Sequence, residues 1–129
     1  LVMPPDRPSD RTEMAVYDKP TFVRSTYGTT YIIDSYQTVC LEASHQYVII
    51  HLRSGSFKVR CSLTNLLSQL PSCFVRVHRS YAVNALLVVG MKGSLITLIN
   101  GGTVSVPSKR IRKVRSTLQQ VMIGPAAST

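Results

Sequence analysis

Alternation of apolar and polar positions dominates the middle of the chain and predicts short β-strands. In residues 46–53, Val48, Ile50 and Leu52 fall on one side of an extended strand, and the residues between them face the other way. Ser54 and Gly55 then form a turn, and residues 57–61 return with the same alternation, which is typical of a β-hairpin. The same criteria predict further strands at 22–27, 30–34, 38–43, 74–78, 86–91, 95–99 and 103–106.

Two segments have helical rather than alternating periodicity. The first begins at the N-cap residue Ser62, carries four leucines at helical spacing and ends before Pro71. The second runs from Ser108, a plausible N-cap, to Met122, with an apolar residue every three or four positions. No strand–helix–strand spacing typical of a parallel sheet is present, so the sequence predicts a mainly β, antiparallel fold with a short helix and a C-terminal helix.

The ends of the chain differ from its middle. Residues 1–20 contain four prolines among charged and small residues without any period, so we expect a linker there. Residues 124–129 have the composition of a flexible tail. A chain of 129 residues accommodates one domain, which we place at residues 21–123.

Charge is distributed very unevenly. All six carboxylates lie in the first 42 residues, whereas residues 43–129 contain eleven lysines and arginines and no acid, and the whole chain carries a net charge of +9. Such a region has no internal counter-charge, so we expect an external polyanion as its partner.

Catalytic and metal-binding functions find no support in the sequence. Asp34 and Glu42 are the only acids beyond residue 20, and the three cysteines and three histidines match no zinc-binding spacing. We therefore expect neither an enzyme nor a metal or other cofactor. An odd number of cysteines without a CxxC pair favours the reducing cytoplasm, and no apolar run approaches the ~20 residues of a membrane-spanning helix.

The segment 74–84 (FVRVHRSYAVN) is the densest candidate for binding chemistry. Arg79 and Ser80 follow a predicted strand, where a loop exposes them, and an arginine there reaches a phosphate or the edge of a guanine. Arg76 and His78 share one face of that strand. His78 and Asn84, taken alone, are better explained as groups that stabilise turns.

Two other segments carry chemistry suited to DNA. Lys109 and Arg110 stand in the first turn of the predicted C-terminal helix, where cations oppose the helix dipole at a cost of roughly 0.3–1 kcal/mol each. A phosphate backbone passing that end would reverse this effect. The turn at residues 44–47 offers Gln46, which suits an adenine edge, together with His45 and Ser44. Taken alone, this second segment is an ordinary polar turn.

The block 74–84 resembles, almost position for position, the aromatic-x-Arg-x-His-Arg-Ser-Tyr-x-Val-Asn signature of the LytTR family of bacterial DNA-binding domains. The resemblance extends over about residues 22–121. It implies an elongated fold of small antiparallel sheets, in which loops rather than a recognition helix contact DNA. In that family the loops enter successive major grooves, and they correspond here to residues 44–47, 79–80 and 108–110.

Two departures leave alternatives open. Pro107 and Ser108 replace a Val-Ser-Arg-like run, so the basic residue that contacts a base is Lys109 or Arg110. The first loop is short, so its base-facing residue is His45 or Gln46. Arg79 completes the predicted base contacts. The predicted phosphate contacts are Ser44, Lys58, Arg60, Arg76, His78, Ser80, Arg112 and Lys113, with Arg115 as a further candidate.

The resemblance also implies partners. It predicts binding to double-stranded DNA with direct repeats, as a dimer, and a receiver domain or membrane sensor upstream of this domain. A basic β-sheet module that binds proteins or any polyanion is the alternative, and an RNA-binding domain is a third. DNA binding predicts that Arg79, Lys109 and Arg110 lie along one edge of the molecule, whereas a protein-binding module predicts that they are scattered.

Overall fold

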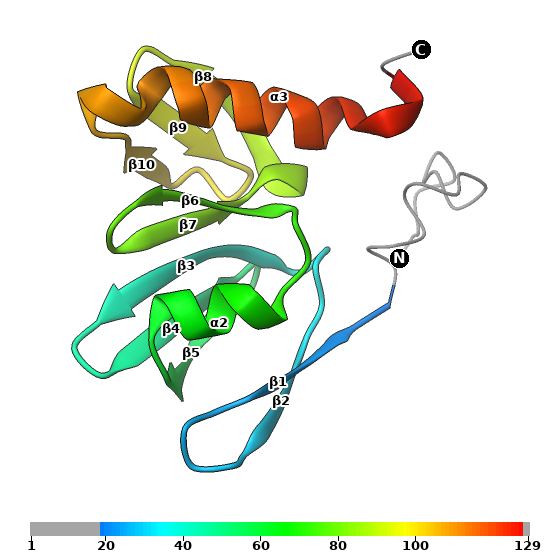
Figure 1. Ribbon diagram of the computed structural model, residues 1–129, viewed down its shortest axis with the longest axis vertical. Helices are drawn as coiled ribbons and strands as arrows, with labels where there is room; N and C mark the ends of the chain where they lie inside the picture. Colours follow the sequence, from blue (N-terminus) through cyan, green and yellow to red (C-terminus); the bar gives the residue numbers. More distant parts are fainter. Residues whose placement is uncertain (1–18, 128–129) are drawn as a thin grey trace.

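The computed structural model describes residues 19–127, with the side chains of residues 19–121. In this part of the chain, ten strands form three antiparallel sheets, and two α-helices and two short 3₁₀ turns complete the fold. Figure 1 shows the sheets arranged along the long axis, with a two-stranded sheet at one end and the C-terminal helix α3 (Ile111–Ala127) at the other. The predicted mainly β fold of small antiparallel sheets is confirmed.

A five-stranded sheet occupies the middle of the molecule in the order β5-β4-β3-β7-β6. Its strands are β3 (Thr38–Ser44), β4 (Tyr47–Leu52), β5 (Gly55–Arg60), β6 (Phe74–His78) and β7 (Tyr81–Asn84). The predicted alternation of β4 is confirmed, because Val48 and Ile50 are fully buried on one face and pair with Val59 and Phe57 of β5. Tyr47 lies on the opposite face, which is more open.

The face that carries Val48 is covered by the short helix α2 (Leu63–Gln69) and by the hairpin of β1 (Thr21–Arg24) and β2 (Thr30–Ile33). The predicted cap of α2 is confirmed, because the Oγ of Ser62 accepts a hydrogen bond from the third residue beyond it at 3.0 Å. Residues of these elements and of the central sheet form a buried cluster that we call the lower core.

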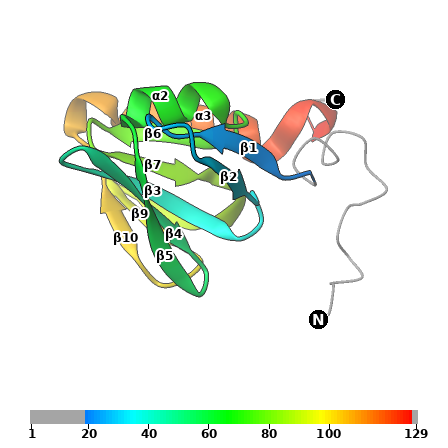
Figure 2. The same cartoon turned by 90° about the horizontal axis from the view of Figure 1, so that it is seen from below.

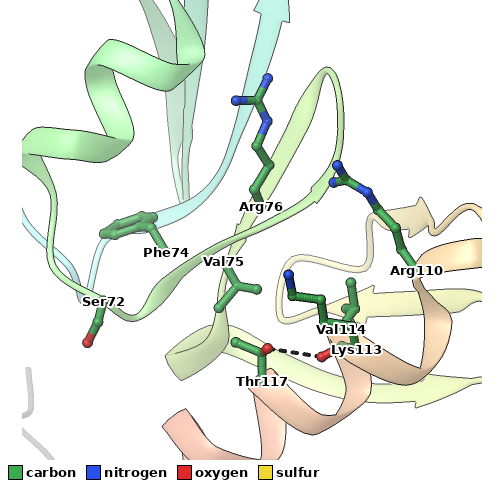
Figure 3. Close-up of a pocket in the computed structure, with 8 residues that line it drawn as sticks. All are labelled: Ser72, Phe74, Val75, Arg76, Arg110, Lys113, Val114 and Thr117. Carbon is green, nitrogen blue, oxygen red and sulfur yellow. Dashed lines mark hydrogen bonds between the residues drawn. The ribbon is translucent and has the colours of Figure 1, made fainter.

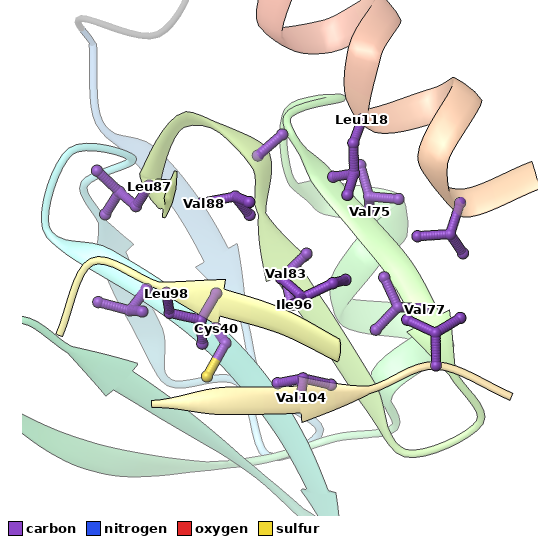
Figure 4. Close-up of a cluster of buried hydrophobic side chains, with 14 residues drawn as sticks. Cys40, Val75, Val77, Val83, Leu87, Val88, Ile96, Leu98, Val104 and Leu118 are labelled. Atoms are coloured by element: carbon purple, nitrogen blue, oxygen red, sulfur yellow. The ribbon is translucent and has the colours of Figure 1, made fainter. Parts of the chain in front are cut away.

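The opposite end of the molecule contains a second cluster, which we call the upper core and which Figure 4 shows. It lies between the central sheet, the three-stranded sheet of β8 (Val88–Lys92), β9 (Leu95–Leu98) and β10 (Thr103–Ser105), and helix α3. Because side chains alternate along β6, this strand contributes to both cores. Val75 and Val77 belong to the upper core, and the preceding Phe74 belongs to the lower core. Seen from below in Figure 2, both α-helices lie on the same side of the sheets.

The structure differs from the prediction between β7 and β8. A strand was expected at 86–91, but Ala85–Leu87 form a 3₁₀ turn, η1, and the strand begins at Val88. The cause is Asn84, which is completely buried. Its side chain accepts a hydrogen bond from the N–H of Leu86 at 3.0 Å and donates to the main-chain oxygens of Ser35 and Thr38.

The start of the C-terminal helix also differs. Ser108 is not an N-cap: Ser108–Arg110 form a 3₁₀ turn, η2, and the α-helix begins at Ile111. Pro107 occupies the position before η2, and its oxygen accepts from the N–H of Arg110 at 2.8 Å, so no side chain caps this end. The helix continues to Ala127, past the predicted end at Met122 and through Gly124 and Pro125.

Candidate nucleic-acid interface

The three predicted binding segments lie on the same side of the molecule. In Figure 1, the β3–β4 turn, the β6–β7 turn and η2 follow one another along the left-hand side. Figure 2, viewed from below, has all three at the same end. The segments that hold Arg79, Lys109 and Arg110 are thus gathered along one edge rather than scattered.

The β3–β4 turn is a tight connection of two residues. His45 and Gln46 stand between Ser44 and Tyr47, which face each other across the hairpin. Both turn residues are exposed. His45 has a φ of 58°, in the left-handed region that two-residue hairpin turns require and that costs a non-glycine residue roughly 1–2 kcal/mol. The strained turn holds both side chains out of the sheet, and the half-buried Ser44 lies at its base.

The β6–β7 turn presents Arg79 to solvent and fixes its own backbone. The N–H of Ser80 donates to Nδ1 of His78 at 3.0 Å, and the main-chain oxygen of Ser80 accepts from the N–H of Ala43 at 2.8 Å. His78 thus holds the turn through one ring nitrogen. Its predicted phosphate contact would have to use the other.

Arg76 has a positioning role that the sequence did not indicate. Its guanidinium donates to the main-chain oxygen of Arg79 at 2.6 Å, to Oγ1 of Thr64 in α2 at 2.7 Å and to the main-chain oxygen of His78 at 3.4 Å. An arginine has five N–H donors, so contacts to phosphate remain available to it. The main action of this side chain is to tie the β6–β7 turn to α2.

The cations around η2 are exposed. Four of them follow closely along the chain: Lys109, Arg110, Arg112 and Lys113. Arg115 on the same helix is exposed as well, and so is Ser108. Arg110 and Lys113, together with Arg76, border a cleft of about 410 Å³ between β6 and α3. Its floor is apolar, as Figure 3 shows. The first turn of this helix contains no acid, so its N-terminal N–H groups and cations together favour an anion.

Lys58 and Arg60 lie on the open face of β5, next to the β3–β4 turn, and both contact aromatic rings. The Lys58 ammonium lies 5.5 Å from the centre of the Tyr47 ring, and the Arg60 guanidinium lies 5.6 Å from the same ring. On its other side Arg60 lies 4.9 Å from the ring of Tyr27, in the β1–β2 turn. The sequence pattern did not single out Tyr27, although an aromatic residue beside a glycine in a predicted turn is a signal for exposure.

Among the described residues, the strands of the central sheet contain one acid, Glu42. Its carboxylate accepts hydrogen bonds from the hydroxyl of Tyr81 at 3.2 Å and bonds with Nε2 of His51 at 2.9 Å. Burial and the Glu42 charge raise the pKa of the Tyr81 hydroxyl above its ordinary value. Within the described part of the chain, His51 and Glu42 form the one close contact between a basic side chain and a carboxylate, so no described lysine or arginine is paired with a described carboxylate.

The three thiols belong to the cores. Cys40, Cys61 and Cys73 are buried and unbonded to one another, and burial raises the pKa of Cys40 to about 11 and that of Cys73 to about 12. The residues described by the structure contain no group of three or more potential metal ligands. No helix in the described range is long and apolar enough to cross a membrane.

A β-rich domain that gathers exposed basic turns on one edge is the arrangement of a nucleic-acid-binding domain that lacks a recognition helix. The sequence matches the family described as the LytTr DNA-binding domain over residues 28–119. This match covers most of the chain, which therefore belongs to the LytTR family of DNA-binding domains.

A solved structure supports the fold. The LytTr DNA-binding domain of a protein described as a methyl-accepting/DNA response regulator from Bacillus cereus is similar, with a TM-score of 0.62. The two chains are 23% identical, and the similarity covers 78% of this chain and 96% of the other. None of the curated proteins matches this chain.

Proposed function

We propose that this chain is the sequence-specific, double-stranded-DNA-binding output domain of a bacterial transcriptional regulator that acts in the cytoplasm. The observation that carries the proposal is the edge on which three exposed turns with basic or amide side chains follow one another. No described lysine or arginine is paired with a described carboxylate, which supports the proposal because an external anion can then serve as the counter-charge.

The proposed contacts fall into two sets. Arg79, one of Lys109 and Arg110, and one of His45 and Gln46 contact base edges in successive major grooves. The second set contacts phosphates and comprises Ser44, Lys58, Arg60, Arg76, His78, Ser80, Arg112, Lys113 and Arg115. Arg76 and His78 combine this contact with their hydrogen bonds inside the β6–β7 turn.

The partners follow from the family. We propose that the target site contains direct repeats, that two copies of the domain bind it, and that a receiver domain or membrane sensor precedes the domain in the regulator. Direct repeats place the two copies in the same orientation, and copies that bind on one side of the duplex lie about 34 Å, or a multiple of it, apart.

Selection from randomised duplexes, followed by fluorescence anisotropy at two salt concentrations, tests the proposal. We expect a repeated motif to emerge. Arg79→Ala removes the preference at one base position, worth about 1–3 kcal/mol, because a bidentate contact is lost. Arg112→Ala, the matched control, weakens all sequences alike, because it removes only a phosphate contact.

Equal binding of all sequences would contradict specific recognition. If the affinity is also lost as the salt concentration rises, the domain is a non-specific polyanion binder. The slope of log K against log salt concentration is then about −0.9 for each phosphate contact. That result would favour the alternative function, a basic β-sheet module without base contacts.

A further inference from the structure

The β1–β2 turn is a fourth rigid turn close to the edge that carries the other three. The N–H of Ser25 donates to the oxygen of Thr29 at 2.8 Å, and the N–H of Gly28 donates to the oxygen of Ser25 at 3.0 Å. Gly28 has a φ of 87°, which a residue with a side chain adopts only under strain. The N–H of Thr26 donates to the oxygen of Arg60 at 2.9 Å, so the turn is tied to the end of β5.

This rigid turn exposes a large aromatic side chain. Tyr27 is 71% exposed and belongs to neither core. Its ring lies 4.9 Å from the Arg60 guanidinium, which lies 5.6 Å from the ring of Tyr47, whose other neighbour is Lys58 at 5.5 Å. We call these four side chains, Tyr27, Arg60, Tyr47 and Lys58, the tyrosine–cation row.

The chemistry of the row suits phosphate. A guanidinium that interacts with ring faces is held in position, while its N–H groups remain available to an oxyanion in the fork geometry that phosphate accepts. The nearest acid on this face, Glu42, is already bonded to His51 and Tyr81. The row therefore presents two cations without a competing carboxylate among the described residues.

The place of the row in the sheet connects it to the DNA-binding edge. Arg60 stands opposite Tyr47, and Tyr47 stands opposite Ser44, which closes the β3–β4 turn. The strand that carries Arg60, β5, thus lies one strand spacing, about 5 Å, from β4, which leads out of that turn. Tyr27 precedes residues 28–119, so the family match does not include it.

We propose that the tyrosine–cation row grips backbone phosphates of the duplex next to the bases that the β3–β4 turn contacts, and that Tyr27 holds Arg60 in place for this purpose. The proposal rests on the proposed function, because it requires a duplex at this edge. It adds a supporting role for the β1–β2 turn and places the phosphate contacts of Lys58 and Arg60 beside the β3–β4 turn.

The test uses the duplex that selection returns, and two shorter duplexes that lack several base pairs at one end or the other. Each is titrated with the wild-type chain and with Tyr27→Ala, Arg60→Gln and Phe22→Ala. Phe22 is the matched control, because it is an aromatic residue of the same hairpin, 65% exposed, that pairs with Ile32 rather than with a cation.

We expect wild type and Phe22→Ala to lose about five- to tenfold in affinity when one particular end is removed. Arg60→Gln shows part of that loss already on the full duplex, is less sensitive than wild type to removal of that end because only Lys58 remains, and has a salt slope smaller by about 0.9. Tyr27→Ala behaves in the same direction with a smaller loss, and Tyr27→Phe, which keeps the ring, restores wild-type affinity. The base preference is unchanged in all four variants.

Two results would overturn the proposal, and they are distinguishable. If Arg60→Gln and Tyr27→Ala bind the full duplex as wild type does while Arg79→Ala still changes the base preference, the row only packs the β1–β2 turn and the proposed function stands. If the wild-type chain selects no duplex at all, the proposed function fails and the row fails with it. Circular dichroism of each variant shows that the fold is intact.

Discussion

At the scale of single residues, Arg76 of β6 and Arg79 of the β6–β7 turn have different tasks. Arg76 makes three hydrogen bonds that join the turn to α2, whereas Arg79 points into solvent and its main-chain oxygen receives one of those bonds. The exposure of Arg79 was predictable, because it follows a strand in a polar turn. The bond from Arg76 to Thr64 was not, because it depends on how α2 packs against β6.

Lysine substitution separates these tasks. In Arg76→Lys a point charge replaces the fork, so we expect the free energy of unfolding in urea to fall by about 1–2 kcal/mol as hydrogen bonds within the protein are lost. Arg79→Lys is expected to leave stability within about 0.5 kcal/mol, because the side chain is exposed. Equal losses in the two variants would contradict the positioning role of Arg76.

The buried thiols predict how stability changes with pH. The pKa of Cys40 is raised from 9.0 to about 11 by burial and by Glu42, so the folded state keeps this proton at a pH where the unfolded state loses it. The thiol therefore contributes stability that is fully present below pH 9 and is lost as pH rises toward 11. We expect chemical denaturation to show this fall, and a smaller one in Cys40→Ala.

Thiol labelling tests independently whether the three cysteines are buried in the folded protein. At pH 8, a disulfide reagent is expected to modify no more than a small fraction of the three buried cysteines in the folded protein and all three in guanidinium. Rapid modification without denaturant would show that the cores open readily.

At the scale of elements, the helices and strands that the sequence predicted depend mostly on residues close to one another in the chain. The hairpins at 46–61 and 88–98 follow from alternation around short turns, and α2 follows from its cap and its leucine spacing. The two 3₁₀ turns were not predictable in this way. η1 depends on hydrogen bonds from Asn84 to residues more than 40 positions away, and η2 depends on Pro107 at its start.

Asn84 is expected to be the most sensitive polar position of the fold. Asn84→Ala leaves two buried main-chain oxygens and one N–H without their partner, so we expect a loss of about 3 kcal/mol or more, measured by thermal unfolding. Ser62→Ala, which removes only the exposed cap of α2, is expected to cost about 1 kcal/mol. A loss at Asn84 no larger than at Ser62 would show that water replaces the buried amide.

At the scale of the whole molecule, β6 and β7 belong to both cores and join the two ends of the domain. Phe74 and Ala82 contact the lower core, whereas Val75 and Val83 contact the upper core. The sequence indicated which residues of these strands are apolar. It did not indicate that both faces are covered, because a buried strand and a half-buried one differ only in what packs on them.

Because both faces of β6 and β7 are buried, we expect the domain to unfold as one unit. Leu66→Ala in the lower core and Leu118→Ala in the upper core are each expected to lower the free energy of unfolding by about 2–5 kcal/mol within a single transition. Circular dichroism and tyrosine fluorescence should give the same midpoint for each variant. Separate midpoints would mean that the two ends are independent.

The tight turns at the proposed DNA-binding edge have a consequence for how such a domain acquires new targets. His45, Gln46, Arg79, Lys109 and Arg110 are all exposed, and none of them contributes a side chain to either core. With the proposed base contacts, recognition and folding depend on different positions, so we expect a combinatorial library at these five sites to change the preferred DNA sequence while the fold is kept.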